Sequence, residues 1–296
     1  MFPARFEYLA PTSWDEAIAL LSEHGPEAKV LAGGCSLIPL LKLRLAEPHF
    51  LIDLRLVGAR DVTLDGDELR IGAMTRESTI EYAPIVAAHC PVLAETSAVI
   101  ADPIVRNMGT VGGNLAHADP ANDHPATMLA LGAQVVVRGR DGERTLPVED
   151  FFIDLFQTAL APDELVTEIL IPTPPPGTGA AYVKFERQVG DFPIVGVAAQ
   201  VSVADGIIQS ARIGLTNVGP TAIRAKAAER SLIGAPASAE SAAAAAEATR
   251  DGVEPWGELR GSARYKLDIL PVIARRALVR AFARASTGGV IPGDGA

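Results

Sequence analysis

Two pairs of adjacent glycines most constrain what this 296-residue chain can fold into. One pair is Gly33 and Gly34, and the other is Gly112 and Gly113 within the sequence TVGGN at residues 110–114. Adjacent glycines leave backbone N–H groups unshielded and let another molecule approach the main chain closely. We therefore expect two turns that could hold one phosphate-bearing cofactor between them.

The first glycine pair lies between a predicted strand and a predicted helix. Residues 29–32 form a short apolar run typical of a buried strand, and a helix is expected to begin near Leu37. Ser36 can cap this helix, and Pro39 is tolerated in its first turn. A strand, a glycine turn and a helix N-terminus form an anion-binding arrangement. A tight turn without a ligand is the alternative, because bare glycine motifs are frequent.

Up to residue 171 the hydrophobic pattern predicts short strands and helices. Further strands are predicted at residues 50–54, 68–71, 134–138 and 165–171. Helices are predicted between Ser13 and Gly25 and at residues 76–82, 91–100 and 124–131. The proline run at residues 172–177 then stops the last strand. Such a run is stiff and suits a link between domains.

After the proline run the pattern changes to longer strands, which indicates an antiparallel sheet. The predicted strands are residues 181–187, 195–203 and 207–218. Helices are predicted at residues 221–232 and 238–249, and a longer helical region at 262–285 is expected to be interrupted by Pro271. From Ser286 onward the chain is glycine-rich and expected to fray.

Composition excludes several classes of function. With 26 basic and 36 acidic residues the net charge is -10, so nucleic acid is not an expected partner. No apolar run approaches the roughly 20 residues of a membrane span, and no signal peptide is visible. The two cysteines, Cys35 and Cys90, are too few for a four-thiolate metal site or a disulfide framework, which suits the cytoplasm. Electron chemistry would therefore need an organic cofactor or a partner chain.

A metal site is the alternative use of the stretch after the second glycine pair. His117, Asp119, Asp123 and His124 are residue types that bind divalent ions. However, Asp123 and Pro125 are also typical of a helix start, and a lone His117 could be a hydrogen-bonding loop residue or a neighbour of a cofactor. A non-redox binding protein or a metal-dependent protein is thus the second hypothesis. The motifs of Rossmann dehydrogenases, P-loop proteins, zincins and serine hydrolases are absent.

Four segments, taken in order, resemble one family. They are residues 32–45 (AGGCSLIPLLKLRL), 110–126 (TVGGNLAHADPANDHPA), 184–199 (KFERQVGDFPIVGVAA) and 260–278 (RGSARYKLDILPVIARRAL). Read alone, residues 184–197 would be a solvated strand face followed by core. Together the segments resemble the FAD-binding medium subunits of molybdenum hydroxylases, the group of carbon monoxide dehydrogenase, xanthine dehydrogenase and aldehyde oxidoreductase. The resemblance covers nearly the whole chain.

The resemblance implies an α+β fold in two domains and a tail. Residues 1–176 would form a two-part FAD-binding domain of the vanillyl-alcohol-oxidase (PCMH) type. Residues 177–288 would form the carbon monoxide dehydrogenase flavoprotein C-terminal domain, with a three-stranded antiparallel sheet and helices. Residues 289–296 would be a flexible tail.

The resemblance also implies which residues bind FAD. The two glycine turns would hold its pyrophosphate, and the matching residues are Ala32, Gly33, Gly34, Cys35, Ser36, Leu37, Thr110, Gly112, Gly113 and Asn114. Asp123 matches a position at the polar portion of the cofactor, and Lys184 matches a lysine that contacts FAD. Ile100 and Val166 match apolar contacts of the flavin, and Phe192 a position near the isoalloxazine. At position 35 the family usually has a polar residue, and this chain has a cysteine. A contact made by the main-chain N–H tolerates this change.

By resemblance, this chain is an oxidoreductase subunit without catalytic residues or metal ligands of its own. A large subunit would oxidise carbon monoxide, an aldehyde, a purine or an N-heterocycle at molybdenum. Electrons would pass through two [2Fe–2S] clusters of a small subunit to FAD and on to a quinone, a cytochrome, NAD or oxygen. The expected assembly is a dimer of heterotrimers, and the acceptor could be membrane-associated. A free-standing flavin reductase is the variant within the redox class.

Overall fold

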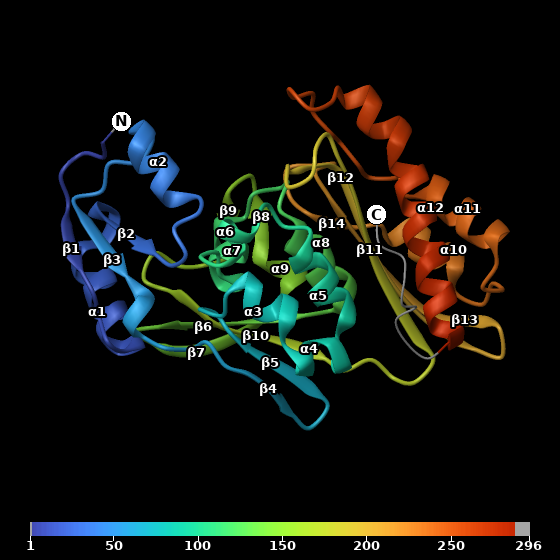
Figure 1. The fold of residues 1–296 in the computed structure, drawn as a ribbon, viewed down its shortest axis with the longest axis horizontal. Coiled ribbons are helices and arrows are strands. Elements are labelled where there is room, and N and C mark those ends of the chain that lie inside the picture. The colour runs from blue at the N-terminus through green and yellow to red at the C-terminus, as the bar shows by residue number, and fades with distance from the viewer. Residues whose placement is uncertain (1, 288–296) are drawn as a thin grey trace.

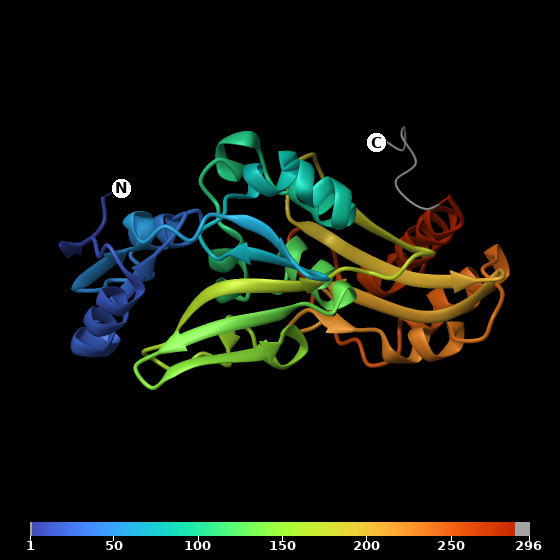
Figure 2. The same cartoon turned by 90° about the horizontal axis from the view of Figure 1, so that it is seen from below.

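The computed structural model describes residues 2–287 of the chain. Its elements form three parts that follow one another along the molecule in sequence order (Figure 1). Each part is built around a sheet of its own, and each has a hydrophobic cluster of buried side chains. Figure 2 shows the C-terminal sheet extending away from the central one.

The N-terminal part is a parallel sheet with strand order β1 (Glu7–Leu9), β3 (Phe50–Asp53), β2 (Ala28–Leu31). Helix α1 (Trp14–His24) buries Ala17, Ile18 and Leu21 beside this sheet. Its cap confirms the prediction, because the Ser13 hydroxyl accepts the N–H of Glu16 and Gly25 ends the helix. Helix α2 (Leu37–Leu43) follows β2 after the first glycine pair.

The central part is an antiparallel sheet whose middle strand, β10 (Leu165–Pro172), is buried on both faces. The other strands are β4 (Val62–Asp65), β5 (Glu68–Gly72), β6 (Gln134–Gly139) and β7 (Gly142–Pro147), in the order β4-β5-β10-β6-β7. Its helices are α3 (Glu77–Tyr82), α4 (Pro84–His89), α5 (Pro91–Ala98), α6 (Pro103–Arg106), α7 (Val111–His117), α8 (Asp123–Leu131) and α9 (Val148–Phe151), followed by the hairpin β8 (Phe152–Asp154) and β9 (Gln157–Thr158).

The C-terminal part is an antiparallel sheet covered by helices. The strands are β11 (Thr178–Glu186), β12 (Pro193–Ala204), β13 (Ile207–Thr216) and β14 (Ile223–Arg224), and the helices are α10 (Lys226–Leu232), α11 (Ala239–Ala248) and α12 (Ala263–Thr287). The expected three strands are present, and β14 adds a fourth. The prediction of one helix over residues 221–232 was wrong at its start, because Ile223 and Arg224 pair with β13. The division of the chain at residue 176 stays a prediction.

Helix α12 continues through Pro271, so the predicted interruption was wrong. Proline cannot donate a hydrogen bond to the carbonyl four residues earlier. That carbonyl, of Leu267, instead accepts the Nε of Arg250 at 3.1 Å. Fraying from Ser286 was also wrong for Ser286 and Thr287, which belong to α12. The predicted tail at residues 289–296 lies outside the described residues.

No helix within residues 2–287 combines the length and the hydrophobicity that a bilayer crossing requires.

Helix α8 joins the central and C-terminal parts, and all nine of its residues are buried. It packs on both β12 and β13, and β13 approaches it through Gly214. A Cβ atom at Gly214 would lie 1.9 Å from the carbonyl oxygen of Ala126 on α8. The two sheets can therefore share α8 only because this position has no side chain.

The loop ahead of α12 is anchored by a buried amine. Lys266 is fully buried, and its Nζ lies 2.8 Å from Oε1 of Glu258 and 2.9 Å from Oδ1 of Asn217. The Nδ2 of Asn217 also donates to Oε1 of Glu258 at 2.7 Å. Burial alone would raise the pKa of Glu258, but the hydrogen bonds from Lys266 and Asn217 outweigh it and hold this pKa below its ordinary value of 4.5.

Replacing Gly214 by alanine tests the shared packing on α8. We expect Gly214→Ala to lower the free energy of unfolding by about 1–3 kcal/mol, because main-chain atoms of α8 must move. Gly219→Ala is the control, since its Cβ would meet no atom closer than 3.7 Å. Urea unfolding monitored by circular dichroism measures both, and equal midpoints for the two variants would contradict the packing argument.

Replacing Glu258 tests the anchor through pH. A lowered pKa stabilises the fold fully above the ordinary pKa, and this stabilisation is lost as the pH falls through the lowered value. The stability difference between wild type and Glu258→Gln should therefore be largest near pH 7 and shrink below about pH 4.5. Urea midpoints measured from pH 7 to pH 3 give this difference. Glu254 is exposed and serves as the control: the urea midpoint of Glu254→Gln should change with pH as that of wild type does. If the midpoint of Glu258→Gln also changes with pH as that of wild type does, the prediction is refuted.

Candidate cofactor site

A row of free main-chain amides lies between β2 and α2. Five consecutive residues contribute these amides: Gly33, Gly34, Cys35, Ser36 and Leu37. None of their N–H groups donates to a protein acceptor within residues 2–287. These residues are partly or fully exposed, so the amides can reach solvent or a ligand. Gly34 turns the chain with a φ of 79°, which favours glycine. We call these five N–H groups the amide row, and such a row is an anion-binding feature.

Ser36 stands at the N-cap of α2 but does not cap it. Its backbone is helical, with φ -97° and ψ -48°, and its hydroxyl makes no capping hydrogen bond. The predicted cap was therefore wrong. A capping oxygen accepts the N–H of the second or third helical residue, but the N–H of Ile38 already donates to the Gly34 carbonyl and Pro39 has no N–H, so the Ser36 hydroxyl has no amide to accept.

The second glycine pair is used differently, because it lies inside the first turn of α7. Thr110 caps this helix, and its Oγ1 accepts the N–H of Gly113 at 3.2 Å. The neighbouring N–H groups are also used: that of Val111 donates to the Thr75 carbonyl, that of Gly112 to the Ala73 carbonyl, and that of Asn114 to the Thr110 carbonyl. The expectation of unshielded amides was thus wrong for this pair. Gly112 instead permits close packing, since its Cβ would lie 2.5 Å from that of Ala73.

The structure brings the two glycine segments side by side, as the sequence predicted. A Cβ at Gly33 would lie 2.2 Å from the carbonyl oxygen of Met108, and one at Gly113 would lie 3.4 Å from the Cβ of Ala32. The Asn114 Oδ1 atom is buried without any hydrogen-bond donor among the described residues. Free amides on one segment and an unpaired acceptor on the other fit a ligand that carries both phosphate and hydroxyl or amine groups.

The two cysteines have different surroundings, and neither is in a disulfide. Cys35 is exposed, and its Sγ lies 3.7 Å from the carbonyl oxygen of Val105. Partial burial of the sulfur raises the Cys35 pKa, and the nearby Glu77 carboxylate adds to this rise. Burial raises the pKa of the Cys90 thiol to about 12. Both thiols are therefore protonated near neutral pH, and neither is poised as a nucleophile.

The metal hypothesis fails because its candidate ligands turn to different partners. His124 is fully buried, and its Nε2 lies 2.5 Å from Oε2 of Glu77. The ring of His117 packs 5.2 Å from that of Phe156, and burial lowers the pKa of His117. The carboxylate of Asp119 accepts a main-chain N–H of its own turn. Among residues 2–287 no group of three such side chains could hold a metal ion.

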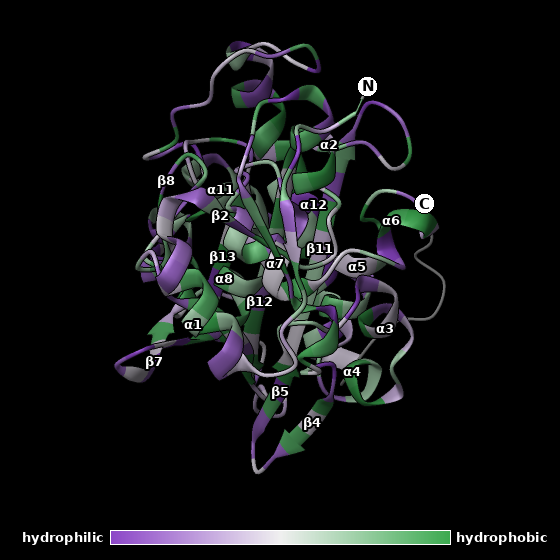
Figure 3. Ribbon diagram, turned by 90° about the vertical axis from the view of Figure 1, so that its left-hand side faces the viewer, coloured by the Kyte–Doolittle hydropathy of each residue, from purple (hydrophilic) through white to green (hydrophobic). Residues whose placement is uncertain are grey.

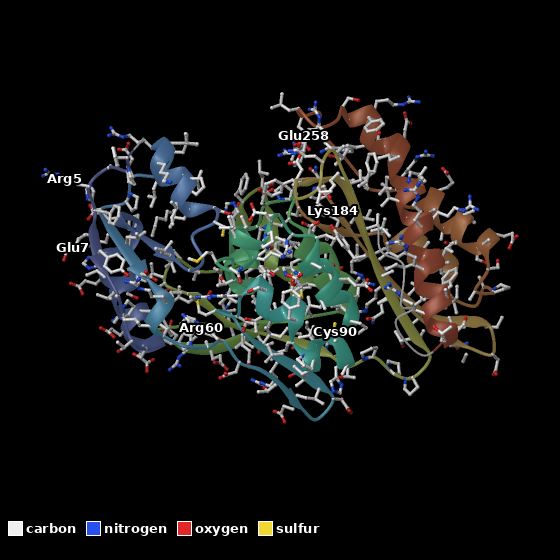
Figure 4. The ribbon with its side chains drawn as sticks, in the orientation of Figure 1. Arg5, Glu7, Arg60, Cys90, Lys184 and Glu258 are labelled. Atoms are coloured by element: carbon white, nitrogen blue, oxygen red, sulfur yellow. The ribbon has the colours of Figure 1, made fainter. Side chains whose placement is uncertain are left out.

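Asp123 and Lys184 form a buried ion pair between the central and C-terminal parts. Lys184 Nζ lies 3.2 Å from Asp123 Oδ2 and 2.8 Å from the carbonyl oxygen of Val99, and the two side chains are 4% and 6% exposed. The hydroxyl of Tyr182 donates to Asp123 Oδ1 at 2.5 Å. Burial raises the Asp123 pKa, and Lys184 opposes this rise. Lys184 belongs to β11 and is labelled in Figure 4; with a side chain only 4% exposed, it is not on a solvated face.

A buried arginine that the sequence analysis missed holds the segment between Ile100 and the second glycine pair. Arg106 is 9% exposed, and its Nε lies 2.8 Å from Oε2 of Glu81. Its Nη1 donates to the carbonyl oxygens of Ile100 and Ala101 at 3.0 and 3.3 Å. Asp102 followed by a proline is a helix-start signal that could have revealed α6, but not the partners of Arg106.

The remaining predicted residues are two buried aliphatic side chains and one exposed aromatic ring. Ile100 and Val166 are 9% and 7% exposed. Val166 precedes Thr167, whose carbonyl accepts the N–H of Ala73, the residue against which Gly112 packs. Phe192 is 42% exposed.

Comparison with known proteins identifies the family. Residues 4–174 match the FAD binding domain in molybdopterin dehydrogenase, and residues 180–281 match the CO dehydrogenase flavoprotein C-terminal domain. The chain belongs to the FAD-binding subunits of molybdenum hydroxylases. The carbon monoxide dehydrogenase medium chain of Hydrogenophaga pseudoflava is 44% identical over 285 residues, 96% of this chain and 99% of that one. The subunit is thus a part of an oxidoreductase and carries FAD.

Solved structures share the whole fold of the subunit. Carbon monoxide dehydrogenase from Hydrogenophaga pseudoflava, in a form that lacks the Mo-pyranopterin moiety, matches with a TM-score of 0.94 at 46% identity, over 96% of this chain and 99% of that chain. Quinoline 2-oxidoreductase from Pseudomonas putida 86 matches with a TM-score of 0.91 at 34% identity, over 96% and 99% of the two chains. The family resemblance and the FAD assignment made from the sequence are confirmed.

The ion pair between Asp123 and Lys184 can be tested by removing one partner. Lys184→Met leaves a buried carboxylate unpaired, and we expect a loss of about 3–5 kcal/mol in the free energy of unfolding. The double variant Lys184→Met/Asp123→Asn should recover part of this loss, because the Asp123 charge is gone and only Glu186, whose side chain is 21% exposed, is left without the amine. Urea unfolding measures all three proteins.

A surface pair provides the control for this experiment. Lys226 pairs with Glu149, and its side chain is 60% exposed. Lys226→Met should cost about 0–1 kcal/mol. If Lys184→Met lowers the free energy of unfolding no more than Lys226→Met does, the buried ion pair does not hold the two parts together.

Proposed function

We propose that this subunit is the electron-transfer subunit of a molybdenum hydroxylase complex. It accepts electrons from [2Fe–2S] clusters of a small subunit and passes them to an external acceptor. The large subunit oxidises the substrate at molybdenum, and the substrate is carbon monoxide, an aldehyde, a purine or an N-heterocycle. The observation that carries this proposal is the amide row beside the second glycine pair, because it gives the cofactor a defined place between two segments of the chain.

We propose that the amide row binds the pyrophosphate of FAD. Main-chain N–H groups carry partial positive charge, and an unpaired row of them favours a phosphate over water. Cys35 fits this role because its N–H, not its thiol, would make the contact. On the facing segment, the unpaired Asn114 Oδ1 can accept a hydrogen bond from the cofactor.

The family resemblance assigns further residues to the same cofactor. We propose that Ile100, Val166 and Phe192 contact the flavin and that Asp123 and Lys184 lie at its polar portion. Lys184 is already held by Asp123, by Glu186 at 3.2 Å and by the Val99 carbonyl, so its ammonium would be fixed in place with its charge balanced by two carboxylates. When bound, FAD supplies the electron chemistry, while the protein supplies orientation and local polarity.

An exposed apolar surface flanks the amide row and suits a partner subunit. Its side chains are 39–77% exposed and belong to Ile38, Leu43, Leu45, Ile104 and Met108. They lie on or next to α2 and α6, whose ribbons are largely coloured as hydrophobic in Figure 3. Exposed apolar patches beside a functional site are typical of protein contacts. We propose that the small iron–sulfur subunit docks here, within a dimer of heterotrimers, and that the acceptor is reached from another side and could be membrane-associated.

A single charge should test the assignment of the amide row. Ser36→Asp places a carboxylate beside these N–H groups at the N-terminus of α2, where the helix dipole favours a negative charge, so the fold should be at least as stable. The same charge repels a phosphate, and we expect FAD affinity to fall about tenfold or more. Ser36→Asn, which is isosteric and neutral, is the matched control. Fluorescence titration with FAD measures all three proteins.

The wild-type chain provides the baseline for that titration. Its absorption spectrum should show flavin bands near roughly 370 and 450 nm, with about one released FAD per chain. Equal FAD affinities for Ser36→Asp and Ser36→Asn would contradict the role of the amide row. A colourless chain that takes up no added FAD would contradict the proposed function.

A further inference from the structure

Two turns of the C-terminal part meet around the ring of Phe192. The first precedes β12 and contains Asp191, and the second precedes α12 and contains Arg260. The Nε and Nη2 atoms of Arg260 each lie 2.7 Å from Oδ1 of Asp191. The guanidinium carbon lies 5.4 Å from the centre of the Phe192 ring, which is a cation–π distance. The same Asp191 oxygen accepts the N–H of Phe192 at 2.8 Å, so one carboxylate links the arginine to the phenylalanine backbone.

The turn that carries Arg260 is held firmly. Glu258 and Gly261 exchange main-chain hydrogen bonds of 2.9 and 3.2 Å across it. Glu258 is itself bound by the buried amine of Lys266, and its other oxygen lies 3.5 Å from Arg260. Figure 4 places Glu258 in the loop ahead of α12. Arg260 is therefore fixed to the C-terminal core through a chain of ion pairs rather than being a free surface cation.

The turn that carries Phe192 touches the central part. A Cβ at Gly190 would lie 2.9 Å from the carbonyl oxygen of Ala101, the residue that follows Ile100 and that Arg106 holds. The turn that carries Phe192 thus lies at the border between the two parts, and the Phe192 ring keeps 42% of its surface exposed although an arginine covers part of it. An aromatic ring that is fixed yet exposed at a border between parts is suited to a planar ligand.

We propose that Arg260 is a positioning residue for the cofactor: through Asp191 and the Phe192 ring it fixes the aromatic face that the flavin meets. This inference rests on the proposed function. Arg260 needs no contact with FAD for this role. It acts by limiting the motion of Phe192 before binding, because a ring that is already ordered loses less entropy when a ligand stacks on it. The planar fork of arginine makes both the carboxylate and the ring contact, which lysine cannot reproduce.

A double-mutant cycle on the FAD-loaded full chain tests this role. Phe192→Ala should weaken FAD binding by about 2- to 12-fold, the worth of one aromatic contact, and raise the fluorescence of the bound flavin. Arg260→Gln should change both quantities in the same direction by a smaller factor. The double variant should match Phe192→Ala alone, because Arg260 acts only through the ring. Arg260→Lys should resemble Arg260→Gln.

Arg264→Gln is the matched control, because this arginine pairs with Asp268 nearby and is 84% exposed. It should leave affinity and fluorescence unchanged. Asp191→Asn provides a second route, since it weakens the link to Arg260 without removing the cation. Circular dichroism verifies that each variant is folded.

Three outcomes would overturn the inference while leaving the FAD site intact: wild-type behaviour of Arg260→Gln, wild-type behaviour of Phe192→Ala, or effects that multiply in the double variant. A wild-type chain without affinity for FAD would overturn the proposed function together with this inference.

Discussion

Helix α8 has no side that faces solvent, and the rest of the structure depends on this constraint. Its first two residues are ionisable, and neither can be buried without a partner. They turn in different directions: Asp123 meets Lys184 and Tyr182 of the C-terminal sheet, and His124 meets Glu77 at the start of α3. One helix start therefore fastens two parts of the chain. Asn122, which precedes this helix, also donates to the Asn114 carbonyl at 3.1 Å, so the proposed cofactor site adjoins this point.

The two glycine pairs look alike in sequence but solve different physical problems. Gly34 turns the chain, and the row of amides around it is left free to bind a ligand. Gly112 lets α7 press against Ala73, which is a feature for packing. The amides around it are already used inside the protein. Glycine alone does not distinguish these uses, because both require only the absence of a side chain.

Much of the fold and the family could be predicted from the sequence, because periodicity, helix caps and ordered motifs are local signals. Ser13, Gly25 and the alternating strands of the C-terminal part are examples. The errors concern partners that are distant along the chain. Pro271 does not break α12 because Arg250 satisfies the freed carbonyl, and Ile223 and Arg224 are not helical because they pair with β13. Arg106 and Arg260 were missed for the same reason: their roles depend on carboxylates and carbonyls that no short motif contains.

The amide row also bears on how such a subunit can change over evolutionary time. A site made of main-chain N–H groups has no side chain that must be inherited, apart from the glycine that shapes the turn. Cys35 occupies the middle of the row without disturbing it, and Ser36 and Leu37 could vary in the same way, whereas Gly33 and Gly34 could not. For the proposed pyrophosphate site, identity counted at these positions would underestimate how well the amide row is kept, because the contact depends on the backbone path rather than on the side chains.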